Sequence, residues 1–480
     1  MRRAAALAGL APARRLRPFG SLGRRRPLAL LAGLALLALA DSLAGCARRP
    51  PPPELVLVTL DTFRQDQLGC TGHPTVRTPY LDRLARHGTL WRDALTPIPL
   101  TTPSHASILS GLSPKTHRLL RNRMRLRDDV VTIAQRLRNL GYRTSAVVSN
   151  RLVLHPDLGL GRGFDTYDVI EPKHLPASGE GAQTVERAIS RLADKGGARS
   201  FLWVHFFDAH LPYLPPEPWD RVYGAAGNVA SPRAGSRADS LDPRAREALR
   251  ARYAGEVSFV DRCVGRLARA MEERSDRAPS VLLITADHGE GLGDHEGYFG
   301  HDLQVYDTSL RVPMLVVPMR GGALPEARAG TVSTEAARTF DLAPTLAGLA
   351  GLSRDPGAEG RDLLHDPPPA GDARLLFAET HPEPEKGRVL YALRTEDSKV
   401  IWCPEERRWE FYDLRSDPGE TSALARADSA GNALQAALVD DLRRRPVGSQ
   451  RTIDEERGGL DEETRRALQS LGYVGGSGSP

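Results

Sequence analysis

The stretch Leu55-Val56-Leu57-Val58-Thr59-Leu60, followed at once by Asp61-Thr62, decides the fold. An unbroken run of apolar and β-branched residues predicts a strand that is buried on both faces, as in a parallel sheet covered by helices. Comparable runs occur at residues 143–148, 200–207 and 280–285, and helical periodicity occurs at residues 79–87, 130–140 and 243–273. This alternation predicts an α/β fold, with a mostly parallel sheet sandwiched by helices.

The pattern changes near residue 370, where shorter β-type runs begin. They lie at residues 389–395, 398–402 and 410–414, and helical periodicity returns at residues 462–471. We therefore expect a catalytic domain at residues 54–370 and a small C-terminal α+β subdomain at residues 371–474. The Gly- and Ser-rich end, residues 475–480, is expected to be a disordered tail.

The N-terminal segment has the pattern of an export signal at residues 1–45. Arginines come first, and the apolar run at residues 27–40 is shorter than the ~20 residues that span a bilayer. The sequence Leu43-Ala44-Gly45-Cys46 resembles the bacterial lipobox, which would make Cys46 an acylated residue at the start of a Pro-rich tether, residues 46–53. The expected location is periplasmic or at the cell surface, as a membrane-anchored lipoprotein. The alternative is an ordinary cleaved signal or a short N-terminal anchor, with Cys46 unmodified.

The charge distribution excludes a nucleic-acid partner. The formal net charge is +5, but residues 1–45 carry eight arginines and one aspartate, so the rest of the chain is slightly acidic. A nucleic-acid-binding domain needs a basic surface to neutralise phosphates. With 40% hydrophobic and 26% charged residues, the composition is that of an ordinary globular protein.

Polar side chains follow three of the expected strands at the point where each strand ends. These are Asp61-Thr62, then Asp208 and His210, and then Asp287-His288. Because the carboxyl ends of parallel strands meet at one edge of the sheet, their carboxylates and imidazoles can converge on a divalent metal ion. A single Asp at such a position is more often a turn or helix-cap residue. His205, inside a strand, is interpreted as a core or supporting residue.

The segment from Pro99 to Gly111 is typical of a loop that enters a helix, with Pro103 suited to the first turn. Thr101 would then lie at a helix N-terminus, where backbone N–H groups and the helix dipole favour a substrate oxyanion. A simple Ser/Thr helix cap is the alternative interpretation of Thr101.

The same segment resembles the signature of the sulfatase family, within the alkaline phosphatase superfamily. From Thr101 to His117 the order is Thr-x-Pro-Ser-His-x-Ser-x-x-x-Gly-x-x-Pro-x-x-His, where sulfatases have Cys-x-Pro-Ser-Arg-x-x-x-x-x-Gly-x-x-Pro. The likeness extends to other segments, namely residues 58–66, 78–82, 287–290, 300–301, 310–313, 412–414 and 417–421. The resemblance therefore covers most of residues 54–425 and implies the sulfatase fold.

The resemblance also implies roles for particular residues. Asp61, Asp287 and His288 would hold the metal ion, with Thr62 as a weaker ligand candidate, and Thr101 would be a nucleophile on the same ion. His210 and His301 would contact the transferred group or protonate the leaving oxygen. His105, at the position of the signature's arginine, completes the catalytic candidates. Zinc is the preferred metal, with calcium, magnesium or manganese as alternatives, and Asp208 is left open as a ligand of a second ion.

The departures from the family pattern concern the nucleophile. Formylglycine is made from Cys or Ser, so Thr101 cannot carry the aldehyde chemistry of sulfatases, whereas a phosphothreonine can be cleaved by metal-assisted attack of water. The site thus resembles the nucleotide pyrophosphatase/phosphodiesterases and the lipid phosphoethanolamine transferases. We expect hydrolysis of a phosphate mono- or diester. A sulfate-ester hydrolase and a headgroup transferase acting on cell-surface glycans or lipids are the alternatives, and a binding protein with a decayed site is disfavoured because all the catalytic candidates are present.

Overall fold

The computed structural model describes residues 52–171, 180–194, 199–224, 242–274, 279–325, 328–368, 375–383, 387–444 and 462–470. Residues 51–480 form one compact unit. The expected signal peptide at residues 1–45, the expected disordered tail at residues 475–480 and most of the tether, including Cys46, lie outside the described residues. Within the described ranges, every helix is too short or too polar to cross a membrane.

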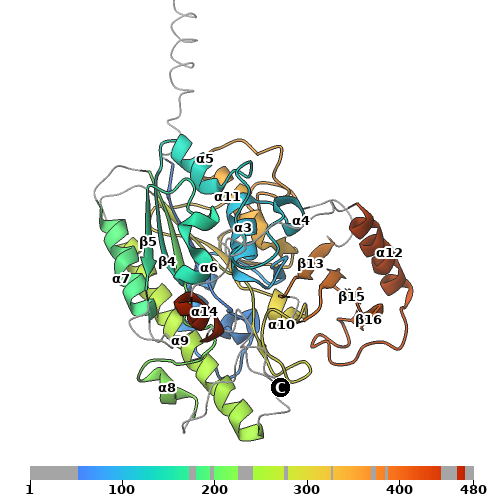
Figure 1. The fold of residues 1–480 in the computed structure, drawn as a ribbon. Helices are drawn as coiled ribbons and strands as arrows, with labels where there is room; N and C mark the ends of the chain where they lie inside the picture. Colours follow the sequence, from blue (N-terminus) through green and yellow to red (C-terminus); the bar gives the residue numbers. More distant parts are fainter. Residues whose placement is uncertain are drawn as a thin grey trace, which may run out of the picture. The chain divides into compact units, whose positions relative to one another are not determined.

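The predicted α/β fold is confirmed by a central sheet of eight strands (Figure 1). The strands are, in spatial order, β11 (Thr331–Ser333), β2 (Thr89–Trp91), β10 (Met314–Pro318), β7 (Ser280–Ala286), β1 (Glu54–Leu60), β6 (Ser200–Phe206), β4 (Arg143–Ser149) and β5 (Thr166–Ile170). The five strands from β7 to β5 are parallel, and β10 is antiparallel to both of its neighbours. The central strands β1 and β7 are completely buried, as their unbroken apolar runs predict, whereas the edge strand β5 is only partly buried.

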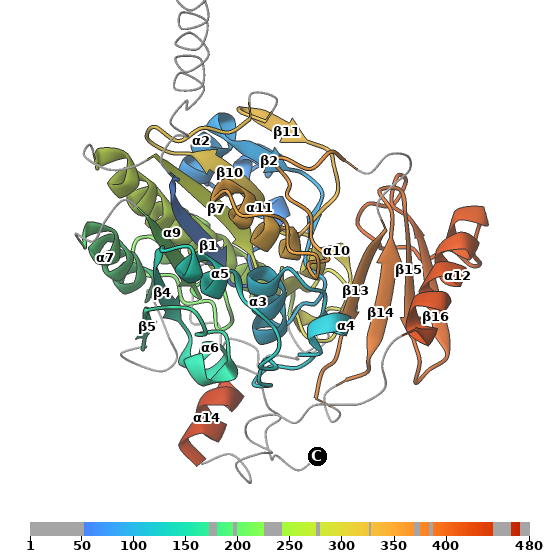
Figure 2. The same cartoon turned by 90° about the horizontal axis from the view of Figure 1, so that it is seen from above.

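Helices cover both faces of this sheet, as the view in Figure 2 shows. One layer contains α2 (Pro79–His87), α7 (Glu180–Ala193) and α9 (Pro243–Glu273), with α8 (Trp219–Val222) packed on α9. The other layer contains α3 (Thr101–Ser110), α5 (Ile133–Asn139) and α11 (Leu342–Leu349), together with α4 (Pro114–His117) and α6 (Arg151–Leu154). Most of the hydrophobic core lies between the sheet and these two layers.

Shorter elements complete the catalytic part. They are the parallel pair β3 (Ala94–Leu95) and β12 (Ala337–Arg338), the antiparallel pair β8 (Gly291–Leu292) and β9 (Phe299–Gly300), helix α10 (Asp307–Leu310), and the 3-10 turns η1 (Gln65–Gln67), η2 (Gly69–Thr71), η3 (Pro156–Leu158) and η5 (Thr339–Asp341).

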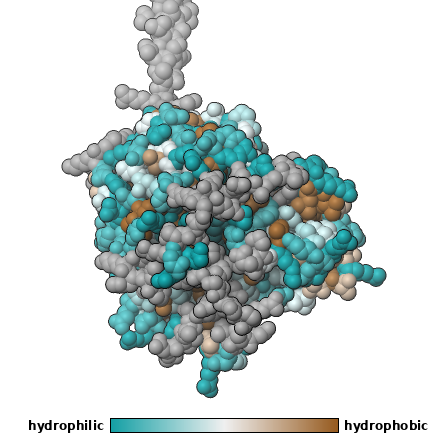
Figure 3. All heavy atoms as spheres, viewed as in Figure 1, coloured by the Kyte–Doolittle hydropathy of each residue, from teal (hydrophilic) through white to brown (hydrophobic). Residues whose placement is uncertain are grey.

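The C-terminal part is a four-stranded antiparallel sheet with a helix against it. The strands are β13 (Leu376–Thr380), β14 (Leu390–Arg394), β15 (Ser398–Cys403) and β16 (Arg408–Asp413), and α12 (Ser429–Arg443) packs on β14 and β15. A further helix, α14 (Glu462–Ser470), follows. The face in Figure 3 is mostly hydrophilic over the described residues, and its apolar side chains form small separate patches.

Candidate active site

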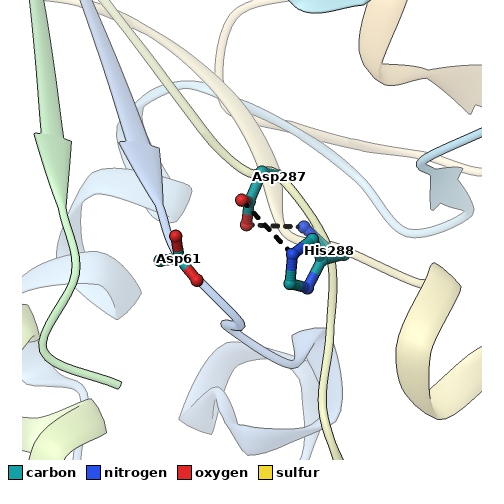
Figure 4. A group of neighbouring side chains, drawn as sticks. All are labelled: Asp61, Asp287 and His288. Carbon is teal, nitrogen blue, oxygen red and sulfur yellow. Dashed lines mark hydrogen bonds and ion pairs between the residues drawn. The ribbon is translucent and has the colours of Figure 1, made fainter. Parts of the chain in front are cut away.

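Two neighbouring strands deliver the candidate metal ligands to one edge of the central sheet. Asp61 follows β1 directly, and Asp287 and His288 follow β7, its parallel neighbour, with Leu60 paired to Ala286 at the strand ends. One ligand atom from each of the three side chains lies within 4.8 Å of the others (Figure 4). All three side chains are buried. The structure therefore brings these three residues together, and their role as metal ligands stays a prediction.

Thr101 is the first residue of α3, as its sequence context predicted, and it is completely buried. Its Oγ1 lies 3.4 Å from His288 Nε2, so the hydroxyl faces the same group of side chains. The Ser104 hydroxyl donates to the Asp287 carbonyl oxygen at 2.8 Å, which ties the first turn of α3 to the loop after β7. The candidate nucleophile is thus placed at a helix N-terminus beside the candidate metal ligands.

The carboxylates have few hydrogen-bond donors for their charge. Asp287 Oδ1 accepts hydrogen bonds from the backbone of Thr62 and His288, but Asp287 Oδ2 and both oxygens of Asp61 accept none from the described residues. Burial raises the pKa of both Asp61 and Asp287, and the nearby Asp61 charge raises that of Asp287 further. Two buried carboxylates with orphaned oxygens, beside an imidazole and a hydroxyl, fit a divalent cation.

Thr62 has two unusual features for a residue beside this group. Its backbone φ is 49°, a left-handed conformation that is strained for a β-branched residue, and its buried hydroxyl has no hydrogen-bond partner among the described residues. Tyr253 helps to hold the turn, because its hydroxyl donates to the Thr62 carbonyl oxygen at 2.7 Å. The role of Thr62 as a ligand stays a prediction.

Three histidines share one tautomer. His288, His210 and His301 each direct Nδ1 at a backbone carbonyl oxygen, of Gly289, Leu211 and Pro99 respectively. A carbonyl oxygen only accepts, so each Nδ1 carries a hydrogen, and the Nε2 of the neutral ring presents a lone pair. Burial lowers the pKa of both His288 and His210, and the nearby His301 lowers it further. The pKa of His210 falls to about 3. His210 is therefore a neutral imidazole near neutral pH.

His105 lies behind Thr101. It is completely buried, its Nδ1 donates to the Thr101 carbonyl oxygen at 2.8 Å, and its Nε2 accepts from the Thr59 hydroxyl at 3.1 Å. Burial, then His205, lowers its pKa, so the ring is neutral. These contacts make His105 a positioning residue for the backbone of Thr101.

His205 extends the same buried network to the first ligand. The Thr59 hydroxyl accepts from Trp203 Nε1 at 3.0 Å and lies 2.9 Å from His205 Nδ1, and His205 Nε2 is 3.3 Å from Asp61 Oδ2. The interpretation of His205 as a supporting residue agrees with this geometry. One chain of polar groups therefore connects the backbone of Thr101 with the carboxylate of Asp61.

Asp208 lies away from the candidate ligands. Its Oδ1 accepts a hydrogen bond from the backbone N–H of Gly181 at 2.9 Å, at the start of α7, and burial raises its pKa to about 7. Over the described part of the chain, the group of Asp61, Asp287 and His288 is the only gathering of three or more His, Cys, Asp or Glu ligand atoms within 4.8 Å. Asp208 thus caps a helix in this structure.

Asn122 is a site residue that the sequence interpretation missed. Its Oδ1 accepts from the backbone N–H of Thr102 at 2.9 Å, directly after the candidate nucleophile. Its amide nitrogen is therefore available as a donor near the N-terminus of α3. Asn122 lies in an irregular Arg-rich loop, and no local pattern in that loop distinguishes it from its neighbours.

Gly289 lies in the loop that carries Asp287 and His288, and this loop packs closely against α10. A Cβ at this position would lie 2.0 Å from the Thr308 carbonyl oxygen in α10. Gly289 and Glu290 donate backbone hydrogen bonds to the carbonyl oxygens of Ser309 and Thr308. Helix α10 therefore supports the segment that carries Asp287 and His288.

The fold and site define a class of α/β enzyme with a candidate metal centre and a candidate nucleophile at the start of a helix, and comparisons with known proteins identify the family. The Sulfatase family model matches residues 53–352, and the model for the C-terminal part of N-sulphoglucosamine sulphohydrolase matches residues 293–446. The chain belongs to the sulfatase family, whose members are ester hydrolases and generally metal-dependent.

Individual relatives cover nearly the whole chain. The chain is 25% identical over 460 residues to the ulvan-active sulfatase of Formosa agariphila, covering 88% of each protein. It is 25% identical to the multifunctional alkaline phosphatase superfamily protein PehA of Trinickia caryophylli, over 81% of this chain and 93% of that protein. The phosphonate monoester hydrolase of Agrobacterium radiobacter has the same fold, with a TM-score of 0.68 and 22% identity over 82% of this chain and 95% of that chain.

Proposed function

We propose that this sulfatase-family enzyme hydrolyses a phosphate mono- or diester through Thr101 as a covalent nucleophile. The observation that carries the proposal is the buried Thr101 hydroxyl, 3.4 Å from His288 Nε2 at the start of α3. Asp61, Asp287, His288 and Thr101 would hold a divalent cation, preferably zinc, with Thr62 beside them. A cation bound there would supply one kind of chemistry, the acidification of the Thr101 hydroxyl.

The remaining steps belong to the chain's own residues. Thr101 Oγ1 gives up its proton to solvent and attacks phosphorus, the bond from phosphorus to the leaving oxygen breaks, the leaving oxygen takes up a proton from water, and a phosphothreonine forms. The donors proposed for the phosphoryl oxygens are the Thr101 backbone N–H and the Asn122 amide nitrogen. The other N–H groups of the first turn of α3 are not available, because Thr102 N–H binds Asn122 Oδ1, Pro103 has none and Ser104 N–H binds the Leu100 carbonyl oxygen. In this proposal His210 and His301 contact the leaving oxygen. Water then attacks phosphorus, which restores the Thr101 hydroxyl and releases phosphate or a phosphate monoester.

Phosphate is preferred over sulfate because of the nucleophile itself. A phosphothreonine can be cleaved by attack of water at phosphorus, whereas Thr101 cannot supply the second hydroxyl through which a formylglycine hydrate expels sulfate. Sulfate-ester hydrolysis is the second candidate, and the similarity to a protein described as an ulvan-active sulfatase favours it. A transferase is the third candidate, in which an alcohol replaces water as the acceptor.

The test compares aryl phosphate, aryl phosphodiester and aryl sulfate with zinc, manganese or calcium added. Thr101→Ala should lower turnover at least ~10³-fold, and Thr101→Ser should retain part of it. Thr102→Ala is the matched control, because the Thr102 hydroxyl donates to the Val153 carbonyl oxygen and not toward the ligands. Mass spectrometry of the trapped enzyme should find a phosphoryl group on Thr101. Turnover that survives in Thr101→Ala rules out the nucleophile, and a preference for aryl sulfate favours the second candidate.

We also propose that the protein is exported and anchored to the membrane through a lipid on Cys46. The support is the signal-like pattern of residues 1–45 and the Leu-Ala-Gly-Cys sequence that ends at Cys46. Processing in cells should be blocked by globomycin and by Cys46→Ala, and the mature N-terminal peptide should carry fatty acid. Unchanged processing in Cys46→Ala would contradict the lipid anchor.

A further inference from the structure

Thr59 is the polar residue in the otherwise apolar run of β1, and it lies two residues before Asp61. Its side chain is completely buried. Three side chains contact its Oγ1, namely Trp203 Nε1 at 3.0 Å, His205 Nδ1 at 2.9 Å and His105 Nε2 at 3.1 Å. A hydroxyl offers one hydrogen and two lone pairs, so these three contacts use its whole hydrogen-bonding capacity.

The direction of each hydrogen bond at Thr59 follows from its neighbours. His105 Nδ1 donates to the Thr101 carbonyl oxygen, so the Nε2 of this neutral ring is an acceptor and takes the only hydrogen of the hydroxyl. Trp203 Nε1 can only donate, which occupies one lone pair. The second lone pair remains for His205, whose Nδ1 must therefore carry a hydrogen. One hydroxyl thus matches one acceptor and two donors, and it holds both imidazole rings in one orientation.

Both rings reach groups of the candidate site. His105 Nδ1 lies 2.8 Å from the Thr101 carbonyl oxygen and 3.8 Å from Asp287 Oδ2. His205 Nε2 lies 3.3 Å from Asp61 Oδ2, and these two atoms attract each other when one hydrogen lies between them, which either group can hold. The orientation that is set in β1 is therefore transmitted to the candidate nucleophile and to the candidate ligands.

We propose that Thr59 is a positioning residue for both Thr101 and Asp61. It acts on the nucleophile through His105 and on the ligand through His205. This inference rests on the proposed function, because that function assigns the roles of Thr101 and Asp61. Residues that orient metal ligands from behind affect metal affinity and turnover strongly. Cation binding and the alignment of the nucleophile thus depend on the same buried hydroxyl.

Thr59→Val removes the hydroxyl with little change of shape. It leaves the N–H groups of Trp203 and His205 and the lone pair of His105 without this partner. We expect the Zn²⁺ affinity of the chelator-stripped full chain, measured by calorimetry, to fall by ~10–100-fold. At saturating zinc, kcat for aryl phosphate should fall by a similar factor with little change in KM, because the loss concerns alignment and not substrate binding. Thr59→Ser keeps the hydroxyl and should stay within ~3-fold of the wild type in both measurements.

Thr144→Val is the matched control, because it removes the hydroxyl of another completely buried threonine in the same sheet. Thr144 lies in β4 at the level of Leu55, near the opposite ends of the strands, and its hydroxyl donates to the Gly163 carbonyl oxygen at 2.6 Å. Zinc affinity and kcat should be unchanged in this variant. If Thr59→Val equals Thr144→Val in both measurements, Thr59 is only a satisfied core residue and the proposal is overturned.

Two smaller substitutions carry the test if Thr59→Val does not fold. Thr59→Ser and Thr59→Cys differ only in the atom that forms the hydrogen bonds, and sulfur is a weak donor and a weak acceptor. The Cys variant should have a zinc affinity and a kcat at least ~10-fold below those of the Ser variant. Equal values in the two variants would overturn the proposal.

Zinc affinity separates this inference from the proposed function. Weaker zinc binding in Thr59→Val than in Thr144→Val, in a protein that turns over no phosphate ester, supports the positioning role and contradicts the proposed function. Unchanged zinc affinity and unchanged kcat for aryl phosphate in Thr59→Val overturn the positioning role and leave the proposed function intact. Losses in both measurements support both. In an active enzyme, a loss in one measurement alone overturns the shared role of the hydroxyl.

Discussion

At the level of single residues, Asp61 and Asp287 are the side chains whose burial destabilises the metal-free protein. Both carboxylates are buried next to one another, and three of their four oxygens accept no hydrogen bond from the described residues. In the metal-free protein this arrangement is unfavourable, because burial and mutual repulsion both oppose ionisation. The arrangement thus suits a bound cation and lowers the stability of the metal-free form.

Asp61→Asn should therefore have opposite effects with and without metal. In chelator the neutral amide removes the repulsion, and we expect the free energy of unfolding to rise by roughly 1–3 kcal/mol. With zinc, the variant should gain little of the stabilisation that ligand binding gives the wild type. Urea unfolding under both conditions measures the effect. Asp129→Asn, at an exposed position, should change stability by less than ~0.5 kcal/mol under either condition. If Asp61→Asn is less stable than the wild type in chelator, mutual repulsion of the two carboxylates does not destabilise the metal-free protein.

Local sequence predicted most of the site residues but not all of them. Asp61, Asp287 and His288 directly follow apolar strands, and strand ends in a parallel sheet meet at one edge, so the pattern alone indicated convergence. Asn122 reaches Thr102 from an irregular loop, and the supporting role of His105 depends on a contact with Thr59. Such contacts depend on the tertiary path of the chain, which local periodicity does not encode.

At the scale of elements, the start of α2 is capped from α9 and not by its own residue. The N-cap residue Thr78 makes no side-chain capping bond, and Asp261 accepts the backbone N–H groups of Tyr80 at 3.2 Å and Leu81 at 2.7 Å. Burial raises the pKa of Asp261 to about 7, against 3.8 as its ordinary value. The junction of the two helices is therefore sensitive to pH.

The sign of the pH dependence follows from proton binding. Between pH 3.8 and about 7 the folded protein holds a proton on Asp261 that the unfolded chain has lost, so stability falls as pH rises through this window. From pH 5 to pH 8 the contribution of Asp261 should fall by roughly 2–3 kcal/mol. Asp261→Asn should remove this part of the pH dependence. The measurement is the difference between the free energies of unfolding in urea at pH 5 and at pH 8. If the free energy of unfolding changes by the same amount between pH 5 and pH 8 in the variant and in the wild type, Asp261 does not titrate in this range.

The elements that the sequence predicted best are those with a clear start signal and a long periodic pattern. Helix α9 spans Pro243–Glu273 as expected, because Asp242 caps it, Pro243 starts it and apolar residues recur along it. The edge of the sheet beyond β7 was not predicted. Strands β2 and β11 have three residues each, too few for a periodic pattern, and β10 pairs antiparallel by tertiary contact.

Helix α10 is joined to the C-terminal sheet by a buried ion cluster. Lys399 Nζ lies 3.0 Å from Asp307 Oδ1 and 2.6 Å from Glu420 Oε1, and Glu420 Oε2 accepts the backbone N–H of Asp307. Arg394 adds a contact to Asp307 at 2.9 Å. Because α10 also binds the loop of Asp287 and His288, the cluster supports the candidate metal site through residues of the C-terminal part.

Removing one charged group from this cluster should lower the free energy of unfolding more than removing two. Lys399→Met leaves Asp307 and Glu420 as buried like charges, and we expect a loss of roughly 3–5 kcal/mol in the free energy of unfolding. The double variant Lys399→Met/Glu420→Gln should recover part of that loss, since the second change removes the orphaned charge. Urea unfolding of the wild type, both single variants and the double variant gives the coupling energy. Additive losses would indicate that the ions do not interact.

For the whole molecule, the sequence pattern changes near residue 370, but the hydrophobic core continues across this position. One cluster of buried apolar residues contains members from both sides of it, among them Leu95, Val305 and Leu310 on one side and Ile401 and Tyr412 on the other. The family models overlap in the same way, since the second begins at residue 293, before the first ends at residue 352. Residues 51–480 form one compact unit.

A chain that ends at residue 370 should therefore fail to form a working catalytic domain. It would expose the apolar side chains that face the C-terminal sheet, and it would leave Asp93 and Asp307 with Arg311 but without Arg394 and Lys399. We expect the fragment to be insoluble, or soluble without a cooperative thermal transition and without tight zinc binding. Co-expression of residues 371–480 should restore soluble protein and zinc affinity, because the missing charges and apolar contacts return together. A soluble, zinc-binding fragment 1–370 would mean that α10 holds the metal loop by itself, and that the ion cluster acts only on the C-terminal sheet.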